Sequence, residues 1–350
     1  MPQFYSLLVS SVNKITKDAV VISFSLSNDL KKKFRFKSGQ YITLLIEINK
    51  EEVRRSYSLC SSPDEEQISI AVKKVNNGKM STFLNDKIRI GDTIKAMQPC
   101  GDFYLSTSSK NNKHYVALCA GSGITPILSM IKKVMKDEIQ STFTLVYGNR
   151  NKTSIMFAKE INKLELENKD QLSVIYIFSQ EKVANQIFGR IDKENLEQLL
   201  FSGGAITADE YFLCGPGKMI DHLNEILQLY NIPRNSIHFE RFNTPIGIKN
   251  LNLTDEVISN VMIIIDDEEF EFDLSSTRES ILDAAIGVGA DIPFSCKGAV
   301  CCTCKAKVIE GEAIMDQNYS LSQEEVDQGY ILTCQAHPVT ENIVIDFDEI

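Results

Sequence analysis

The chain has 350 residues, enough for two or three domains, and its hydrophobic content of 43% lets each domain bury a core. A formal net charge of −10 argues against general nucleic-acid binding, which depends on basic surfaces. The nine cysteines lack the regular spacing of a secreted disulfide framework. Lys14 and Lys17 interrupt any apolar run near the N-terminus, and no stretch reaches the roughly 18 apolar residues of a membrane span. We therefore expect a cytoplasmic protein that does not enter a membrane.

Residues 4 to about 105 have the pattern of short strands separated by turns. The stretches 19–26 and 40–46 are rich in β-branched and aromatic residues and show no helical period. Gly39, Gly91 and Gly101 interrupt the pattern at intervals typical of a small barrel. This part is predicted to be an antiparallel β-barrel.

A different pattern begins at Tyr115. The continuous apolar run 115–120 indicates a strand buried on both faces, and a glycine-containing turn and a predicted helix over 127–135 follow it. Further buried strands are predicted over 143–147, 172–178 and 211–214, with helical segments between them. This alternation predicts a doubly wound parallel α/β domain.

Residues 243–256 carry Pro and Gly without a clear period, and we interpret them as a linker. Beyond it, 261–265 and 270–272 predict a hairpin, and a capping box at Ser276–Glu279 predicts a helix that ends at Gly287 or Gly289. The cysteine-rich loop and a strand over 342–347 complete a compact α+β unit. The predicted boundaries are 1–108 for the barrel, 109–243 for the α/β domain, 244–257 for the linker and 258–350 for the C-terminal domain.

The C-terminal cysteines have the spacing of an iron–sulfur site. Cys296, Cys301 and Cys304 are separated by four and then two residues, and Cys334 follows downstream. This is the spacing of plant-type [2Fe–2S] clusters, in which four thiolates hold two irons. Zinc sites usually combine two C-x2-C pairs, and no second such pair exists here, but zinc or a purely structural thiol-rich loop stays an alternative. Cys302 falls outside the spacing and is interpreted as a non-ligand.

Two short motifs in the barrel region have the chemistry to contact a nucleotide. Arg55-Ser56-Tyr57-Ser58 offers a guanidinium for a pyrophosphate, an aromatic ring for stacking and hydroxyls for hydrogen bonds. Gly78-Lys79-Met80-Ser81 offers backbone N–H groups and a hydroxyl to a phosphate at a helix start. Each has a plainer interpretation, as surface residues of a strand and as a helix capped by Ser81.

Two turns in the α/β part have the context of a ligand site. Gly121–Pro126 follows a buried strand and opens a helix, which suits a pyrophosphate, although it is not the full G-x-G-x-x-G fingerprint and an ordinary turn is the alternative. Cys214-Gly215-Pro216-Gly217 ends another parallel strand, and its thiol could pack on a nicotinamide or simply fill a buried turn. Arg150 could bind an adenosine 2′-phosphate or be a solvated loop charge. The four histidines form no cluster and are given no catalytic role.

Taken in order, these motifs resemble the ferredoxin–NADP reductase superfamily, and the part after Val257 resembles a plant-type [2Fe–2S] ferredoxin. The resemblance covers essentially the whole chain. The segments 296–312, 318–321 and 329–338 are most similar to reductase subunits of phenylacetyl-CoA epoxidase complexes, although steroid- and ring-hydroxylase reductases share the superfamily motifs. The resemblance implies a flavin-binding β-barrel, a nicotinamide-nucleotide α/β domain and a β-grasp ferredoxin domain.

The resemblance also implies roles for individual residues. Arg55 would meet the pyrophosphate of FAD, Tyr57 would stack on the cofactor, and Ser58 would approach the reactive nitrogen of the flavin. Ser58 and Cys214 are the catalytic candidates, and Cys296, Cys301, Cys304 and Cys334 would be the cluster ligands. The other cofactor-binding candidates are Lys73, Gly78, Met80, Ser81, Gly121, Gly123, Thr125, Pro126, Arg150, Ser179, Gly215 and Pro216.

One departure from the family pattern bears on the coenzyme. NADP-specific relatives often carry Ser-Arg-Glu where this chain has Ser179-Gln180-Glu181, so a guanidinium for the 2′-phosphate is missing. Arg150 could replace it, and we expect NADPH only narrowly in preference to NADH.

The sequence as a whole predicts an NAD(P)H-dependent reductase. We expect FAD to accept an electron pair and the cluster to pass single electrons to a partner oxygenase or epoxidase. The acidic net charge suits a basic docking face on that partner. A non-enzymatic redox sensor and a zinc-stabilised binding module are the alternatives. FAD rather than FMN rests on the resemblance alone, and the oligomeric state is not predicted.

Overall fold

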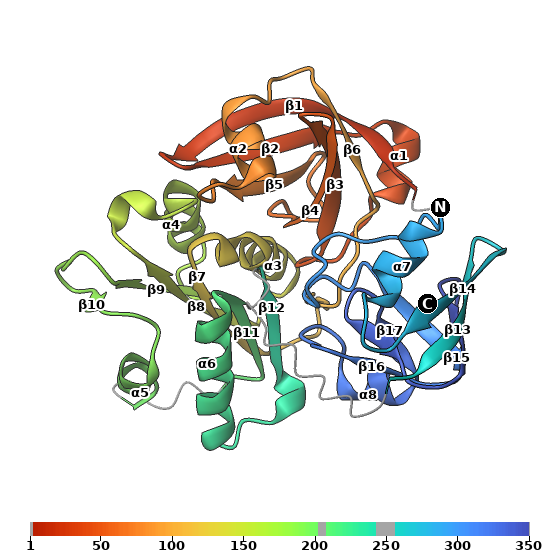
Figure 1. The fold of residues 1–350 in the computed structure, drawn as a ribbon. Helices are drawn as coiled ribbons and strands as arrows, with labels where there is room; N and C mark the ends of the chain where they lie inside the picture. The colour runs from red at the N-terminus through yellow and green to blue at the C-terminus, as the bar shows by residue number, and fades with distance from the viewer. Residues whose placement is uncertain (1–2, 202–207, 243–255, 350) are drawn as a thin grey trace. The chain divides into compact units, whose positions relative to one another are not determined.

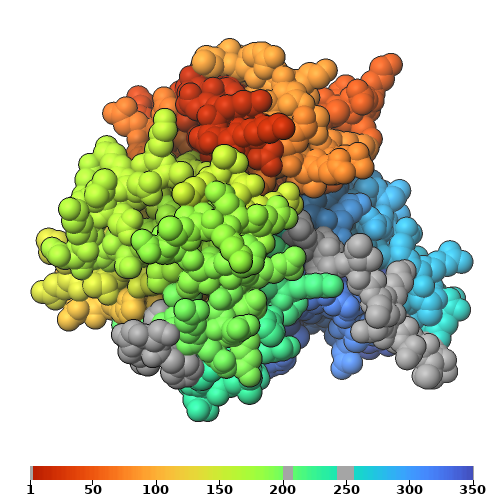
Figure 2. Space-filling model, turned by 90° about the vertical axis from the view of Figure 1, so that its left-hand side faces the viewer, coloured from red at the N-terminus to blue at the C-terminus, as the bar shows by residue number. Residues whose placement is uncertain are grey.

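The computed structural model describes residues 3–201, 208–242 and 256–349 (Figure 1). The chain divides into two compact units. One contains Tyr5–Val53 and Tyr57–Phe242 and thus combines the predicted barrel with the predicted parallel sheet, while the other contains the cysteine-rich C-terminal region. In the first unit, the red and orange barrel residues lie directly against the yellow and green residues of the sheet layers (Figure 2). Most of the predicted linker, 244–257, lies outside the described residues.

The barrel is a six-stranded sheet with the order β4-β3-β6-β1-β2-β5, in which β1 pairs antiparallel with both β2 and β6. Val20, Ile22 and Phe24, alternate residues of β2, are buried in its core, as the two-residue period of a strand requires. Helix α2 packs against β2, β3 and β5. The elements are β1 (Tyr5–Thr16), β2 (Ala19–Ser25), α1 (Asn28–Lys33), β3 (Tyr41–Ile48), β4 (Glu51–Ser58), β5 (Ile68–Lys73), α2 (Lys79–Asp86) and β6 (Thr93–Ala96).

The second layer of this unit is a parallel sheet with the order β10-β9-β8-β7-β11-β12. From β7 the chain adds strands in one direction up to β10, and then returns to place β11 on the other side of β7. Such a reversal opens a crevice at the carboxyl ends of the strands, where α/β proteins bind ligands. The strands are β7 (His114–Ala120), β8 (Thr142–Asn149), β9 (Leu172–Phe178), β10 (Ile187–Phe188), β11 (Glu210–Gly215) and β12 (Ile237–Arg241).

Helices cover both faces of the parallel sheet. Helices α3 (Ile124–Asp137) and α4 (Ala158–Glu167) pack on the face that carries Ala117, Cys119 and Leu145. Helices α5 (Lys193–Phe201) and α6 (Gly217–Leu229) pack on the face that carries Val116 and Leu118. Because both sets of alternating side chains are covered, the strands are apolar throughout, which explains the continuous run seen in the sequence. No helix within the described stretches is long and apolar enough to cross a bilayer.

The C-terminal unit is built on a five-stranded sheet with the order β14-β13-β19-β15-β17. Its first hairpin turns at Asp266 and Asp267, whose φ angles of 53° and 62° fit a two-residue turn between twisted strands. The strands are β13 (Ile258–Ile265), β14 (Glu268–Ser275), β15 (Lys305–Glu310), β17 (Tyr330–Leu332) and β19 (Asn342–Asp346), with β16 (Ala313–Met315) paired to β18 (Ala336–Pro338). The helices are α7 (Ile281–Gly287) and α8 (Gln323–Asp327).

The structure corrects several local predictions. The capping box predicted at Ser276–Glu279 is wrong, because the hydroxyl of Ser280 caps α7 by accepting from the Asp283 N–H. Ser276 instead pairs with Val257, to which its N–H donates at 2.8 Å and from which its hydroxyl accepts at 3.0 Å.

Two helix starts also differ from expectation. Helix α2 is capped by Gly78, so that Ser81 lies inside its first turn. Helix α3 begins at Ile124 rather than at 127, because Pro126 is compatible with the first turn of a helix. The sequence does not predict the short strands β15–β18, since three to six residues are too few to show a period.

Candidate cofactor and cluster sites

A turn follows each of the two strands at the reversal of the parallel sheet. After β7, Gly121–Gly123 form a short 3-10 helix that continues directly into α3. Gly121 has a φ of 56°, a conformation that favours glycine. Because this turn runs directly into α3, the N–H groups without an intrahelical acceptor are those at the start of the turn, whereas the Ile124 N–H donates to the Gly121 carbonyl. Within the described residues no side chain caps α3. This end of α3 therefore suits a diphosphate.

The turn after β11 is in backbone contact with the turn after β7. A Cβ atom on Gly123 would lie 2.1 Å from the Cys214 carbonyl oxygen, so only glycine allows the two turns to pack this closely. Thr125 and Cys214 are both buried, and the Thr125 hydroxyl donates to the Ser122 carbonyl at 3.0 Å. These two candidates thus support the turns from within the protein. Pro126 is buried in the same helix start, and Gly215 and Pro216 link β11 to α6.

Both catalytic candidates meet a carboxylate that the sequence did not single out. The Ser58 hydroxyl, at the end of β4, donates to Oε2 of Glu240 at 2.9 Å. Glu240 lies on β12, directly opposite Cys214 of β11. Burial raises the pKa of the Cys214 thiol well above its usual value, and the charge of Glu240 raises it further. The site therefore combines a neutral thiol with a hydroxyl–carboxylate pair that can hold or pass a proton. An isolated acid 182 residues from Ser58 belongs to no recognisable motif, so sequence reasoning missed it.

The flavin candidates are distributed over β4 and the start of α2. Arg55 is exposed and Tyr57 half-buried, and the alternation of β4 directs their side chains to the same face. Gly78 caps α2 without a side-chain hydrogen bond, at least among the described residues, which leaves N–H groups for a phosphate. The Ser81 hydroxyl accepts from the Val75 N–H at 3.1 Å and so closes the preceding turn. These groups fit a flavin dinucleotide.

Lys73 and Met80 are placed less directly for a cofactor. The ammonium of Lys73 lies 3.8 Å from Oδ2 of Asp18. The Met80 side chain is buried in the barrel core. Either residue would contact a cofactor through its backbone, or after its side chain had moved.

The two candidates for the adenosine end of the coenzyme lie at the ends of β8 and β9. The Ser179 N–H donates to the Asn149 carbonyl at 2.9 Å, and the Gln180 N–H donates to the Arg150 carbonyl, also at 2.9 Å. The Glu181 carboxylate accepts from the Lys152 N–H at 2.8 Å and so ties the two loops together. The exposed Arg150 is thereby held beside Ser179, at the carboxyl end of the sheet.

The four predicted cluster ligands form two pairs of thiols. The thiol of Cys296 donates to Cys301 and lowers its pKa. The thiol of Cys304 in the same way lowers the pKa of Cys334. A structural zinc ion usually takes two C-x2-C pairs, and the sequence has no second such pair. Two irons that each take two thiolates fit this arrangement of pairs.

The backbone around these thiols is shaped for a cluster. The Gly298 N–H donates to the Cys296 sulfur at 3.3 Å, and the Cys296 N–H donates to the Cys301 sulfur at 3.5 Å. Lys297, Ala299 and Cys302 have φ angles of 50°, 63° and 48°, which curl the loop. Hydrogen bonds to the sulfurs tune the potential of a bound cluster, so the residues present fit the group.

Residues outside the cysteine spacing brace this loop. The Ala299 carbonyl accepts from the Tyr319 N–H at 3.2 Å and from the Ser320 hydroxyl at 2.9 Å. The Thr333 hydroxyl donates to the Cys304 carbonyl at 3.0 Å. These supports come from segments that are distant in sequence, and the spacing of the cysteines gives no signal of them.

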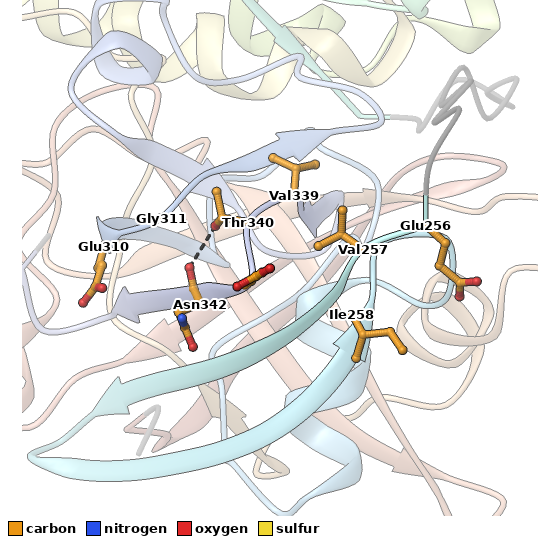
Figure 3. A pocket seen from close by; sticks show the side chains of 9 residues that line it. Glu256, Val257, Ile258, Glu310, Gly311, Val339, Thr340 and Asn342 are labelled. Atoms are coloured by element: carbon orange, nitrogen blue, oxygen red, sulfur yellow. Dashed lines mark hydrogen bonds between the residues drawn. The ribbon is translucent and has the colours of Figure 1, made fainter.

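An open hollow of about 660 Å³ lies on the C-terminal unit (Figure 3). Near its centre the Thr340 hydroxyl donates to the Asn342 carbonyl at 2.8 Å. Three carboxylates line it and disfavour an anionic nucleotide. None of the candidate cofactor or cluster residues is part of it, and we assign it no role in the cofactor sites. Its lining is Glu256, Val257, Ile258, Glu310, Gly311, Val339, Thr340, Glu341 and Asn342.

Three family models match consecutive parts of the chain. Residues 6–104 match an oxidoreductase FAD-binding domain, and residues 117–225 match an oxidoreductase NAD-binding domain. Residues 263–339 match a 2Fe-2S iron–sulfur cluster binding domain. The order confirms the predicted combination of a flavin barrel, a parallel nucleotide-binding domain and a ferredoxin domain.

Curated relatives match over nearly the whole chain. One subunit of the 1,2-phenylacetyl-CoA epoxidase of Escherichia coli K12 is 40% identical over 354 residues, which cover 99% of each chain. The ferredoxin reductase component of 3-ketosteroid-9-alpha-monooxygenase from Rhodococcus rhodochrous is 30% identical over 97% of this chain and 96% of its own. The glycine betaine monooxygenase reductase subunit of Pseudomonas aeruginosa is 28% identical over 97% of this chain and 95% of its own.

Solved structures share the fold. Phthalate dioxygenase reductase matches with a TM-score of 0.59 at 23% identity and covers 98% of both chains. An intact type IV self-sufficient cytochrome P450 monooxygenase matches with a TM-score of 0.72 at 19% identity, over 98% of this chain and 41% of its own.

Together these findings confirm FAD, NAD(P)H and a [2Fe–2S] cluster as the cofactors and coenzyme. The similar proteins are components of oxygenase and epoxidase systems. The chain belongs to the ferredoxin reductase family of NAD(P)H oxidoreductases that combine FAD-binding, NAD-binding and 2Fe-2S domains and supply electrons to an oxygenase component.

Proposed function

We propose that this protein is the reductase subunit of a phenylacetyl-CoA epoxidase and that it oxidises NADPH in preference to NADH. The observation that carries the proposal is the full-length relation to the epoxidase subunit of Escherichia coli at 40% identity, against 30% and 28% for the steroid and betaine reductases. The paired thiols support it, because they suit the one-electron carrier that an oxygenase needs at the end of the chain.

One set of residues would bind the coenzyme and flavin, and the four cysteines would bind the cluster. When bound, FAD accepts an electron pair as hydride and the [2Fe–2S] cluster passes electrons singly. Gly121 and Gly123 open α3 toward the coenzyme diphosphate. Ser58 and Glu240 hold a hydrogen-bonded proton beside the buried Cys214 thiol, where the nicotinamide would meet the flavin. Cys296, Cys301, Cys304 and Cys334 would hold the two irons as thiolates, which requires that their thiol protons be released.

The preference for NADPH rests on Arg150. Its position beside Ser179 at the end of β8 gives the chain one guanidinium where a 2′-phosphate would lie. Glu181, which would otherwise suit the 2′-hydroxyl of NADH, is engaged with the Lys152 N–H at 2.8 Å. Arg150 would thus supply the guanidinium that NADP-specific relatives have in Ser-Arg-Glu and that this chain lacks in Ser179-Gln180-Glu181.

The first test is a visible absorption spectrum of freshly purified protein before and after anaerobic NADPH or NADH. Overlapping flavin and iron–sulfur bands that bleach within seconds are expected, faster with NADPH. A colourless protein that contains zinc would contradict the proposal, and so would a coloured protein that is not reduced by either coenzyme, which is the behaviour of a redox sensor.

The second test identifies the partner. The reduced protein is mixed with the oxygenase subunits of the Escherichia coli phenylacetyl-CoA epoxidase, and consumption of phenylacetyl-CoA is followed with NADPH as the electron source. Turnover above that obtained with the reductase of 3-ketosteroid-9-alpha-monooxygenase is expected. Faster support of the ketosteroid or glycine betaine monooxygenase than of the epoxidase would assign this chain to another oxygenase.

A further inference from the structure

A buried tyrosine lies beneath the turn that opens α3. Tyr147 is on β8, opposite Cys119 of β7, and its side chain is fully buried. Its hydroxyl donates to the carbonyl oxygen of Gly121 at 2.9 Å. The Ile124 N–H donates to the same oxygen, so the Gly121 carbonyl accepts one hydrogen bond from the helix and one from the neighbouring strand.

We propose that Tyr147 is a positioning residue for the coenzyme, because its hydroxyl holds the Gly121 carbonyl and so sets the direction in which the N–H groups of the turn face the diphosphate. The inference rests on the proposed binding of the nucleotide at Gly121–Gly123. The side chain of Tyr147 is fully buried and would not reach the coenzyme directly. It acts through the backbone of the turn.

The geometry of Gly121 makes such a support necessary. Its φ of 56° is the left-handed backbone conformation, which favours glycine. A Cβ atom at this position would meet nothing within 4 Å among the described residues. A side chain at this position would thus add no packing contact that could fix the peptide. Two hydrogen bonds hold its carbonyl, and one of the two comes from outside the helix.

The chemistry of the phenol suits a permanent donor. Burial raises the pKa of the Tyr147 phenol well above its usual value, so the phenol is a hydrogen-bond donor at neutral pH. The Asn149 side chain lies near enough to oppose that rise, and it is itself nine-tenths buried. Its two amide atoms have no hydrogen-bond partner within the part of the chain that the structure describes.

The test compares Tyr147→Phe with Tyr176→Phe in the holoenzyme. Tyr176 is a matched control, because its ring lies 6.1 Å from that of Tyr147 and its hydroxyl donates at 3.2 Å to Asn162 Oδ1, away from the turn. Binding of NADP⁺ and of 2′-AMP, which has the adenosine end but no diphosphate, is measured by calorimetry. Tyr147→Phe should weaken NADP⁺ about five- to tenfold, the size of one net hydrogen bond, and leave 2′-AMP unchanged. Tyr176→Phe should change neither.

Kinetics give a second readout. In Tyr147→Phe the KM for NADPH should rise by the same factor, while the rate at saturating NADPH stays within about twofold. Reduction of the flavin by 1-benzyl-1,4-dihydronicotinamide, which carries no phosphate, should proceed at the wild-type rate. Gly121→Ala tests the same carbonyl independently, because the added methyl has room and only the backbone conformation is opposed. It should reproduce the selective loss of NADP⁺ affinity.

Three results would overturn the inference. Unchanged NADP⁺ affinity in Tyr147→Phe is one, and equal weakening of NADP⁺ and 2′-AMP is another, since it would indicate general loss of packing. The third is the same effect in Tyr176→Phe. If wild-type protein bound no NADP⁺ or NAD⁺ although the dihydronicotinamide reduced its flavin, the proposed nucleotide site would fail, and the inference with it.

Discussion

Cys301 shows what a single residue contributes to the electron path. Its thiol is paired with that of Cys296, so Cys301→Ser would remove one of the two thiolates that we expect to hold one iron. Loss of a residue that only supports a metal ligand lowers metal affinity or activity about 10- to 100-fold. Loss of a ligand itself should therefore slow the reduction of one-electron acceptors by more than about 100-fold. Flavin reduction by NADPH in stopped flow should be unchanged. Cys302→Ser is the control, and an equal loss of flavin reduction in folded Cys301→Ser would contradict a modular path.

Arg150 is the residue that the coenzyme preference depends on. Loss of a guanidinium–phosphate contact costs about 1.5–3 kcal/mol, so Arg150→Gln should raise the KM for NADPH about tenfold or more. The KM for NADH, which has no 2′-phosphate, should not change. Lys163→Gln, which removes an exposed charge on α4, is the control for a general charge effect. Equal changes for both coenzymes would show that Arg150 does not discriminate between them.

At the scale of elements, a buried carboxylate joins the end of α3 to the segment that enters β7. Glu138 is fully buried. Its Oε1 accepts from the Ser108 N–H at 2.9 Å and from the Asn111 amide at 2.7 Å, and its Oε2 accepts from the Tyr115 hydroxyl at 2.9 Å. In the Glu138→Gln variant, an NH2 group replaces one of the two accepting oxygens, and this donor would face N–H or O–H groups that are themselves donors.

We expect Glu138→Gln to cost about 2 kcal/mol of stability, or roughly 5 °C in the melting temperature of the flavin-bound protein. The exposed Glu167→Gln on α4 should stay within about 0.5 kcal/mol of wild type. Identical melting of the two variants would mean that the network around Glu138 adds nothing to the junction.

The contact between the barrel and α3 should depend on pH. Asp64 accepts from the Lys133 ammonium at 2.7 Å, and this hydrogen bond lowers the pKa of the Asp64 carboxyl below its usual value. Because the folded-state pKa is lowered, the stabilisation is fully present above the unfolded pKa of about 3.9 and is lost as the pH falls through the folded value.

Asp64→Asn should therefore lower stability by about 0.5 kcal/mol at pH 7, as for other exposed pairs, and the difference from wild type should shrink below about pH 4. Melting temperatures of both proteins between pH 3 and 8 give the measurement. A difference that persisted unchanged at low pH would rule out the ion pair as its source.

At the scale of the whole molecule, charge is unevenly distributed along the chain. Residues 256–350 contain 20 Asp and Glu but 4 Lys and Arg, which gives a formal charge of −16 and leaves +6 on residues 1–255. Fields of this size speed the encounter with an oppositely charged partner and are screened by salt. Reduction of cytochrome c, a basic protein, should slow about tenfold between low and 0.5 M salt. Ferricyanide, an anion, should not slow, and equal salt dependence of the two acceptors would count against an acidic docking face.

The sequence by itself determined the features that are encoded locally. The cysteine spacing predicts four ligands, because a cluster is wrapped by one short loop, with Cys334 as the distant member of the set. The glycine turn Gly121–Pro126 was found because a buried strand and a helix flank it. The long strands are predicted from runs of apolar and β-branched residues, and the order of the three domains from the motifs along the chain. The family models confirm that order.

Only the tertiary structure decided how distant segments meet. It brought Glu240 to Ser58, Tyr147 to the Gly121 carbonyl and Ser320 to the loop of the cluster. It also divided the four thiols into two pairs and gave the cap of α7 to Ser280 rather than Ser276. In each case a polar group was satisfied by a partner that chain folding placed beside it. Spacing and period along the chain carry no record of such partners, because they depend on which surfaces pack together.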